Sequence, residues 1–327
     1  WANLVARPLY AAGVRPDDVF QNICGYGLFT GGLGFQYGAE WLGALVIPAA
    51  AGNSRRQIKL MRDFGTTVIH TIPSYLTRLH GVFQEVGLDP TSDTELNRLV
   101  IGAEPHSEET RQRIQNLFNV KAYNSYGLSE MNGPGVAFEC EYQDGMHIWE
   151  DAYIAEIVHP ETLQPVPEGD IGELVLTTLD REAMPLIRYR TRDLTRFLPG
   201  RCDCGRVHRR IDRVVGRSDD MIIVKGCNIF PTQIEQVLMK IPEVGHDYLI
   251  VLQNGTGTEE MLIEVEVHPE WFTGDLGALD RLARQVARDV RDEVLVTPRV
   301  KLVEPGAIPK AAGKAVRVKD LRDGKGK

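Results

Sequence analysis

Short stretches of the sequence place aromatic, acidic and basic residues where they could bind one ligand. In YGLSE, residues 126–130, Tyr126 and Gly127 offer an aromatic face for a flat ring and a backbone that can approach a ligand closely. Glu130 offers carboxylate oxygens to a hard cation such as Mg²⁺. Short motifs often occur without such a role, so a surface turn is the simpler explanation while this stretch stands alone.

Three further stretches could bind other parts of the same ligand. Asp193 ends RYRTRD, residues 188–193, and a carboxylate at the end of a strand is suited to accept both hydroxyls of a ribose. Arg217 lies in GRSDD at an expected domain junction. Lys314 follows a flexible Ala-Ala-Gly in IPKAAGK and could bring a cation to a distant phosphate or carboxylate. Each alone is more simply a surface ion pair, but together they fit one substrate.

The elements that must position these residues alternate between strand and helix up to about residue 120. Strands are expected at 19–27, 44–50, 67–73 and 96–104, and helices at 54–65, 74–87 and 107–118. This alternation predicts an α/β fold with a mostly parallel sheet. Ligands bind at the carboxyl ends of such strands, where we expect glycine-rich turns at 25–34 and 102–105.

The second half of the chain follows other patterns. Strands and turns from about 147 to 200 predict a small antiparallel sheet or barrel. Beyond it, helices are expected at 231–241 and 277–293, and strands at 246–253, 260–268 and 299–303. We therefore expect a large domain over 1–218 and a separate α+β domain over 219–327.

The composition is that of an ordinary globular protein. The 327 residues are 43% hydrophobic and carry a net charge of -8, and no long block of Lys and Arg favours nucleic acid or an anionic membrane as partner. The sequence has no run of about 18 apolar residues and no signal-peptide layout, so we expect a cytoplasmic protein. Its five cysteines should be reduced unless some of them bind metal.

Taken in order, the motifs resemble the adenylate-forming enzymes, and within them the phenylacetate-CoA ligase family. The resemblance covers essentially the whole chain and rests on YGLFTGGLG, IGAEP, YGLSEMNGPGVA, IWED, PLIRYRTRDLT, GRSDDMIIVKGCNIFPTQIE and GKAVRVKDLR. It implies a large α/β part followed by a small mobile α+β domain. It also implies that a carboxylic acid attacks the α-phosphate of ATP, giving an acyl adenylate and pyrophosphate, and that CoA then displaces AMP to form a thioester.

The resemblance also assigns roles to matching residues. Lys314 would bridge the substrate carboxylate and the phosphate during catalysis, and Glu130 would hold Mg²⁺. Tyr126 would pack on adenine, Asp193 would bind the ribose hydroxyls, and Arg217 would contact ribose or phosphate. The remaining implied contacts to nucleotide or CoA are Gly102, Ala103, Glu104, Pro105, Gly127, Ser129 and Gly226, the last beside the pantetheine channel, while Asp219 resembles the hinge of the mobile domain.

Two features depart from the family pattern. The family carries a phosphate loop ending in Gly-Lys before the segment that matches WANLVARPLYAAG, and the sequence has nothing like it. Because the chain starts at Trp1 inside an uncapped helical pattern, we interpret it as a fragment; impaired ATP binding is the alternative. The implied acyl pocket consists of Cys24, Tyr26, Phe29 and Gly32. Related ligases often have an aromatic residue at the place of Cys24, so the pocket could admit a bulkier acid than phenylacetate, although an ordinary buried cysteine is the simpler account of Cys24 itself.

Four further residues suggest a structural metal. Cys140, His147, Cys202 and Cys204 offer three sulfurs and one imidazole, a set that suits tetrahedral Zn²⁺. Some members of the family have these positions occupied in this way and others have all four replaced, so the site would be structural. Two alternatives stay open: His208 could replace His147 as the fourth ligand, or the cysteines are simply reduced thiols.

We therefore predict an ATP-dependent aryl or arylacetic acid CoA ligase of phenylacetate catabolism. Its partners would be an aromatic carboxylic acid, ATP and CoA, with Mg²⁺ and Zn²⁺ as metals and a homodimer as the assembly. The alternatives are an adenylate-forming enzyme with another acid or acceptor, and an inactive fragment that binds nucleotide or zinc. Retention of Glu130, Asp193, Asp219 and Lys314 opposes the last of these, because a binding remnant has no evident use for the catalytic lysine.

Overall fold

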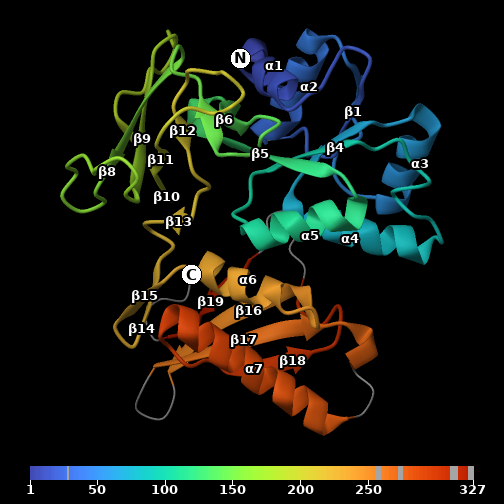
Figure 1. The fold of residues 1–327 in the computed structure, drawn as a ribbon, viewed down its shortest axis with the longest axis vertical. Coiled ribbons are helices and arrows are strands. Elements are labelled where there is room, and N and C mark those ends of the chain that lie inside the picture. Colours follow the sequence, from blue (N-terminus) through green and yellow to red (C-terminus); the bar gives the residue numbers. More distant parts are fainter. Residues whose placement is uncertain (28, 255–258, 272–274, 310–315, 323–327) are drawn as a thin grey trace. The chain divides into compact units, whose positions relative to one another are not determined.

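The computed structural model describes residues 1–27, 29–254, 259–271, 275–309 and 316–322. The chain divides into two compact units, one comprising Trp1–Glu104 and Ile114–Ser218, the other Pro105–Arg113 and Asp219–Lys327. Figure 1 shows the elements of both along the chain. Within the described ranges, no helix has the length and apolar character needed to cross a membrane.

A nine-stranded mixed sheet forms the centre of the first unit (Figure 1). Its strand order is β11-β12-β7-β6-β5-β4-β3-β1-β2, and the five strands from β2 to β5 are parallel. The strands are β1 Val19–Asn22, β2 Leu45–Ile47, β3 Val68–Thr71, β4 Arg98–Gly102, β5 Lys121–Leu128, β6 Gly133–Glu139, β7 Met146–Ile148, β11 Phe197–Leu198 and β12 Arg210–Ile211. The predicted parallel sheet is confirmed for β1 to β4, and β5, which was not predicted as a strand, adds a fifth parallel strand.

The remaining four strands correct the prediction. β7 and β11 were expected in a separate antiparallel sheet, but β7 pairs with β6 and β12, and β11 pairs with β12. They therefore extend the large sheet on its β5 side as antiparallel strands. This extension brings the segments after β6 and after β11 to one edge of the sheet.

Helices cover both faces of the large sheet. α1 (Ala2–Ala11) and α2 (Thr30–Leu42) pack on one face, where Val68 and Val100 lie in their core. α3 (Ser54–Phe64), α4 (Pro73–Glu85) and the end of α5 (Glu108–Phe118) pack on the other face, where Ile69 and Leu99 lie in a second core. Neighbouring residues of one strand thus enter opposite cores, as the pleat requires.

Helix α2 corrects the expectation of a glycine-rich turn over residues 25–34. The irregular segment ends at Phe29, and Thr30 begins a helix of 13 residues. Glycine is a poor helix former, but Gly34 and Gly38 leave no room for a side chain. A Cβ on Gly34 would lie 2.4 Å from Pro134 Cγ, and one on Gly38 would lie 2.6 Å from Val5 Cβ. Close packing against β6 and α1 therefore accounts for glycine at both positions.

A second sheet completes the first unit. It contains β8 (Tyr153–Val158), β9 (Gly172–Thr178), β10 (Tyr189–Thr195) and β13 (Gly216–Arg217) in the order β13-β10-β9-β8. All of its pairings are antiparallel. The predicted antiparallel sheet is confirmed for β8, β9 and β10, and β13 lies beyond the predicted range.

The second unit is an α+β arrangement. Its elements are the hairpin β14 (Ile222–Val224) and β15 (Cys227–Ile229), α6 (Pro231–Lys240), β16 (Val244–Asn254), β17 (Glu259–Val267), α7 (Leu276–Val294), β18 (Arg299–Val303) and β19 (Val318–Asp320). The sheet order is β18-β17-β16-β19, and α7 buries Leu282, Val286, Val290 and Val294. The predicted helices and strands of this part agree within two residues, and the hairpin β14–β15 and strand β19 are additional.

Candidate functional site

The hydroxyl of Tyr126 and the carboxylate of Asp193 join the two sheets of the first unit. Tyr126 lies on β5 rather than on the turn expected for YGLSE, and its hydroxyl donates to Asp193 Oδ2 over 2.5 Å. The pairing of β5 with β6 shifts register directly after Tyr126, a β-bulge of the kind that redirects side chains at sites. Burial, and then the charge of Asp193, raises the pKa of Tyr126 well above its usual value, so the hydroxyl stays protonated.

Asp193 lies on an irregular part of β10. The pairing with β9 shifts register between Arg190 and Leu194, and Arg192 has a φ of 68°, in the left-handed region. Across the sheet, Asp193 faces Arg217 on β13, whose Nη1 lies 3.6 Å from Asp193 Oδ1. The irregularity thus brings one carboxylate between a phenol and a guanidinium, where hydroxyl groups of a sugar could also donate to it.

Glu173 is a buried carboxylate beside β10 that the motifs do not single out. Its side chain is fully buried on β9, and Arg190 donates to both of its oxygens over 2.9 and 2.6 Å. Ser218 Oγ lies 3.5 Å from the same carboxylate, and Ser218 N donates to the Arg192 carbonyl over 2.7 Å. Glu173 therefore ties two strands to the last residue of the first unit. Its sequence signal is a lone charge in the otherwise apolar strand GELVL.

Glu130 lies just beyond β5, in the 3₁₀ segment Ser129–Met131, and both Ser129 and Glu130 are exposed. Burial raises the pKa of Tyr189 on β10, and the charge of Glu130, to which the Tyr189 hydroxyl bonds, raises it further. Arg181 donates to the backbone carbonyl of Glu130. An exposed carboxylate held in this way fits Mg²⁺, which takes one or two protein carboxylates together with waters and substrate phosphates. Neither Tyr189 nor Arg181 was assigned a role from the sequence.

Two glycines at this end of the sheet allow close backbone contact. A Cβ on Gly102, the last residue of β4, would lie 2.4 Å from Ser125 Oγ. A Cβ on Gly127 would lie 2.0 Å from the carbonyl oxygen of Gly133. Neither position accepts a side chain unless the backbone moves.

The segment after β4 is held by the start of α4. Ala103 has a φ of 65°, and the carboxylate of Glu104 accepts hydrogen bonds from Ser74 N and Ser74 Oγ over 3.1 and 2.9 Å. Pro105 follows directly and begins the second unit. Of the four residues expected to contact nucleotide here, Gly102, Ala103 and Glu104 thus lie at the carboxyl end of β4, as parallel-sheet sites require.

The residues predicted for the acyl pocket lie after β1 and at the start of α2. Cys24 is buried, and burial, followed by the charge of Glu104, raises the pKa of its thiol to about 12. The thiol is therefore neutral and a poor nucleophile. Tyr26 and Phe29 are half-buried, and a Cβ on Gly32 would lie 2.4 Å from a carbonyl oxygen of the loop after β1.

Three predicted residues belong to the second half of the chain. Gly226 forms a two-residue hairpin turn with Lys225, with φ values of 78° and 50°, and both residues are exposed. Positive φ at both positions is typical of a type I′ turn. Asp219 directly follows Ser218, the last residue of the first unit, and begins the longer segment of the second. Lys314 lies outside the described residues.

Cys140, His147, Cys202 and Cys204 place three sulfurs and one imidazole nitrogen within 4.8 Å of one another. Cys140 follows β6, His147 lies on β7, and the other two lie between β11 and β12. Cys140 Sγ lies 3.6 Å from Cys202 Sγ, and Cys204 Sγ lies 3.4 Å from His147 Nε2. A tetrahedral zinc with Zn–S bonds of about 2.3 Å holds its sulfurs about 3.8 Å apart, so the donor separations fit this ion.

His147 rather than His208 faces the sulfurs. The Nδ1 of His147 lies 3.4 Å from the carbonyl oxygen of His208, which leaves Nε2 directed at Cys204. Burial lowers the pKa of His147 to about 4, so its ring is neutral, as a metal ligand must be. The ring of His208 instead packs edge-on against Trp149 at 5.4 Å, with Glu150 Oε2 3.9 Å from its Nδ1.

Comparison with known proteins assigns the chain to a family. Residues 2–178 match the family model of the AMP-binding enzyme, and residues 226–322 match that of the AMP-binding enzyme C-terminal domain. The chain is 44% identical over 337 residues to the phenylacetate-coenzyme A ligase of Thermus thermophilus, covering 98% of this chain and 75% of the relative. The chain belongs to the phenylacetate-CoA ligase family. The phenylacetate-coenzyme A ligase of Escherichia coli is 43% identical, with 99% of this chain and 74% of that protein covered.

Solved structures confirm the adenylate-forming fold for this member of the phenylacetate-CoA ligase family. A 2-hydroxyisobutyryl-CoA ligase in the postadenylation state, in complex with R3-HIB-AMP, has 30% identity and a TM-score of 0.92, covering 98% of this chain and 69% of that chain. The same ligase with 2-HIB-AMP and CoA has 30% identity and a TM-score of 0.65, with the same coverage. A benzoate CoA ligase from Burkholderia xenovorans, with 20% identity, a TM-score of 0.71 and coverage of 96% and 64%, shows likeness of fold alone.

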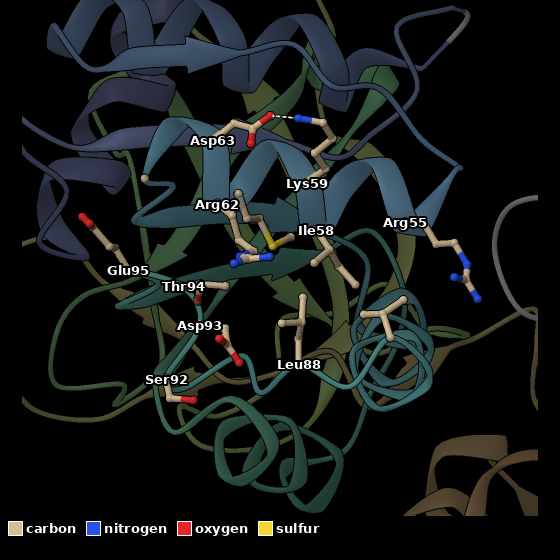
Figure 2. Close-up of a pocket in the computed structure, with 13 residues that line it drawn as sticks. Arg55, Ile58, Lys59, Arg62, Asp63, Leu88, Ser92, Asp93, Thr94 and Glu95 are labelled. Carbon is tan, nitrogen blue, oxygen red and sulfur yellow. Dashed lines mark hydrogen bonds and ion pairs between the residues drawn. The ribbon is translucent and has the colours of Figure 1, made fainter.

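Figure 2 shows a hollow of about 640 Å³ in the first unit. It opens between α3 and the chain that follows α4, and Lys59 pairs with Asp63 on its α3 side. Its lining residues are Arg55, Ile58, Lys59, Met61, Arg62, Asp63, Gly65, Val86, Leu88, Ser92, Asp93, Thr94 and Glu95. None of the residues predicted for the functional site lines this hollow.

Proposed function

We propose that the protein joins an aromatic or arylacetic acid to CoA at the expense of ATP, through an acyl-adenylate intermediate. The single observation that carries this proposal is the pair Tyr126 and Asp193, bonded at 2.5 Å across two sheets, in a chain 44% identical to a phenylacetate-coenzyme A ligase. An aromatic ring beside a carboxylate suits a nucleoside, whose base is flat and whose ribose has two adjacent hydroxyls. Arg217 adds a positive charge beside the same carboxylate.

In the first half-reaction, a carboxylate oxygen of the acid attacks the α-phosphorus of ATP, and pyrophosphate leaves. Tyr126 packs on adenine, Asp193 accepts from the ribose hydroxyls, and the segment Gly102–Glu104 lies beside the nucleotide. Mg²⁺ held by Glu130 would neutralise phosphate charge. Such transfers depend on positioning and on charge neutralisation more than on covalent help from the protein. We assign the second positive charge to Lys314, following the family motif GKAVRVKDLR.

In the second half-reaction, the thiol sulfur of CoA attacks the acyl carbon, AMP leaves, and the thiol proton passes to solvent. Gly226, at the exposed hairpin tip, is suited to a thin chain such as pantetheine because it has no side chain. One site cannot hold Lys314 and the CoA thiol at the same place, which is a physical reason for a domain rotation about Asp219.

Two further assignments belong to this proposal. The acid would lie beside Cys24, Tyr26, Phe29 and Gly32, and the small thiol of Cys24 leaves space for a ring larger than that of phenylacetate. Cys140, His147, Cys202 and Cys204 would hold a structural zinc that ties β6 and β7 to the chain between β11 and β12. A cytoplasmic location and a homodimer remain predictions.

The proposed function is tested by acid-dependent exchange of labelled pyrophosphate into ATP, followed by detection of the acyl-CoA product by mass spectrometry. Lys314→Ala should reduce exchange by at least a hundredfold and affect thioester formation from a supplied acyl adenylate far less. Lys310→Ala, in the same segment, is the matched control. Equal loss in both half-reactions would contradict the role of Lys314, absence of exchange with every aromatic acid would contradict adenylation, and product formed without CoA would replace CoA with another acceptor.

A further inference from the structure

Buried Asn22, the last residue of β1, has one orientation that satisfies its neighbours. Its Nδ2 lies 2.7 Å from the carbonyl oxygen of Gly32, which can only accept a hydrogen bond. This contact identifies the donor side of the amide. The other side, Oδ1, lies 2.8 Å from His70 Nδ1. Because an amide oxygen only accepts, His70 Nδ1 must carry the proton.

His70 is held in this form by its surroundings. Its ring is buried on β3 and stacks on Phe35 of α2 with a centroid distance of 3.6 Å. Burial lowers the pKa of His70 to about 3, so the ring is neutral at physiological pH. The side chain of Asn22 is thereby fixed between His70 of the neighbouring strand β3 and Gly32 of helix α2.

The fixed amide determines the role of the Tyr26 hydroxyl. The second N–H of Asn22 is directed at Tyr26 Oη over 3.0 Å. Tyr26 therefore accepts from Asn22, and its own proton is available to a different acceptor. In the ranges that the structure describes, the bond with Asn22 is the one hydrogen bond of this hydroxyl. Among the described residues, the half-buried Tyr26 thus presents an O–H donor with no protein acceptor.

Space and strand order indicate which part of a substrate could use this donor. A Cβ built on Gly25 or on Gly27 would meet no atom within 4 Å, so there is room on both sides of Tyr26. Tyr26 follows β1, which lies three strand positions from β5, or roughly 14 Å at about 4.8 Å per strand. Thr30, at the start of α2, lies close to Gly133, at the start of β6, because a Cβ on Gly133 would lie 2.2 Å from Thr30 Oγ1. The start of α2 is therefore near the turn that joins β5 to β6. Under the proposed function, the acid's carboxylate would be joined to the nucleotide on that side, and its ring would extend toward Tyr26.

We propose that Tyr26 determines acid specificity by donating a hydrogen bond to an oxygen substituent on the aromatic ring, and that Asn22 and His70 are positioning residues for it. This inference rests on the proposed function and specifies its substrate class as aromatic acids with a ring hydroxyl or ether. The open space at Gly25 and Gly27 is where the added oxygen would be accommodated. A site built around a donor loses affinity for the oxygen-bearing acid when the donor is removed and changes little toward the plain acid.

The test compares kcat/KM for phenylacetate, 3-hydroxyphenylacetate and 4-hydroxyphenylacetate in wild type and in Tyr26→Phe. The preference for at least one hydroxylated acid over phenylacetate should fall about 5- to 10-fold, the effect of one hydrogen bond. Tyr10→Phe, in which an exposed tyrosine of α1 is changed, should keep the wild-type preference. The ratio of two kcat/KM values cancels the fraction of folded enzyme. An unchanged preference, or an equal loss for all three acids, would overturn the inference.

Two variants of His70 separate positioning from packing. The amide of His70→Asn can place an N–H near the position of Nδ1 and should keep most of the preference. His70→Leu removes the donor, frees Asn22 to turn, and should lower the preference as Tyr26→Phe does. Equal preferences in the two variants would exclude His70 as a positioning residue.

The inference and the proposed function fail in different ways. Exchange activity with an unchanged preference in Tyr26→Phe overturns the inference alone. Absence of exchange in the wild type overturns the proposed function, and calorimetric binding of the same three acids then decides the inference. In that case Tyr26→Phe should weaken binding of a hydroxylated acid about 5- to 10-fold more than it weakens binding of phenylacetate; an equal change for all three acids would overturn the inference.

Discussion

Tyr126 and Asp193 lie on different sheets and share a hydrogen bond of 2.5 Å. The residues predicted for adenine and for ribose are therefore one connected pair. Arg217, directly opposite Asp193 in the strand pairing, adds the third member. A change in one member should alter how the others bind nucleotide.

The first prediction concerns this pair. Asp193→Asn should lower kcat/KM for ATP about 10- to 100-fold, because hydrogen bonds to a charged acceptor become bonds to a neutral one. Tyr126→Phe keeps the aromatic ring and should lower kcat/KM for ATP about 3- to 10-fold. The double variant should lose less than the product of the two factors, since the residues share a bond. Pyrophosphate exchange at varied ATP concentration measures all three.

Asp170→Asn is the matched control for the first prediction. Asp170 is an exposed carboxylate in the turn between β8 and β9, in the same sheet as Asp193. Its substitution should leave kcat/KM for ATP within twofold of wild type. An Asp193→Asn variant that behaves like this control would exclude Asp193 from nucleotide binding.

The second prediction concerns zinc. Purified protein should contain about one zinc per chain, and Cys202→Ser should lose it and lower the thermal midpoint, because structural zinc contributes folding free energy. Cys227→Ser, a half-buried cysteine of β15, should keep both zinc and midpoint. Metal analysis and thermal unfolding of the three proteins provide the measurement. Wild-type protein free of zinc after preparation in zinc-supplemented medium would refute the site and leave the cysteines as reduced thiols.

Much of the fold could be predicted because periodicity and turn residues act locally. The parallel strands and the α+β arrangement of the second unit follow from patterns within single segments. Helix α2 could not be predicted in this way, since its glycines are explained by distant partners such as Pro134 and Val5. The antiparallel extension of the sheet was missed for the same reason: β7 and β12 are three and two residues long and are defined by pairing partners far apart in the sequence.

The site could be predicted where one residue carries a recognisable chemistry. Tyr126, Asp193 and Arg217 come from three motifs, and the structure brings them together. The residues that support the site cannot be recognised from their local sequence. Glu173 lies in an ordinary strand pattern, and Tyr189 lies in an arginine-rich stretch. Their contribution depends on strand pairing, which a single sequence does not reveal.

The third prediction concerns the pH dependence of stability. His70 is neutral in the folded state, with a pKa lowered by burial to about 3, whereas an unfolded histidine binds a proton below about 6.5. The stability it contributes is present above pH 6.5 and is lost as the pH falls toward 3, because only the unfolded state gains the proton. Between pH 7 and pH 5 the wild type should lose about 2 kcal/mol more free energy of unfolding than His70→Gln. Urea unfolding at both pH values measures this, and equal losses would show that His70 is protonated in the fold.

The fourth prediction concerns Glu173. Glu173→Gln should lower the free energy of unfolding of the first unit, since Arg190 loses a charged partner that binds it through two hydrogen bonds. Removing one partner of a fully buried pair costs about 3 to 5 kcal/mol, but the side chain of Arg190 is 30% exposed and solvent compensates part of the loss. We therefore expect about 2 kcal/mol, measured by urea unfolding.

Two comparisons show whether Glu173 acts through β10. Glu168→Gln, an exposed acid five residues earlier, should change stability by less than about 0.5 kcal/mol. Because Glu173 also contacts Ser218 and the irregular part of β10 that carries Asp193, Glu173→Gln should raise KM for ATP in the protein that remains folded. A loss of stability with an unchanged KM for ATP would show that Glu173 stabilises the fold but does not position Asp193.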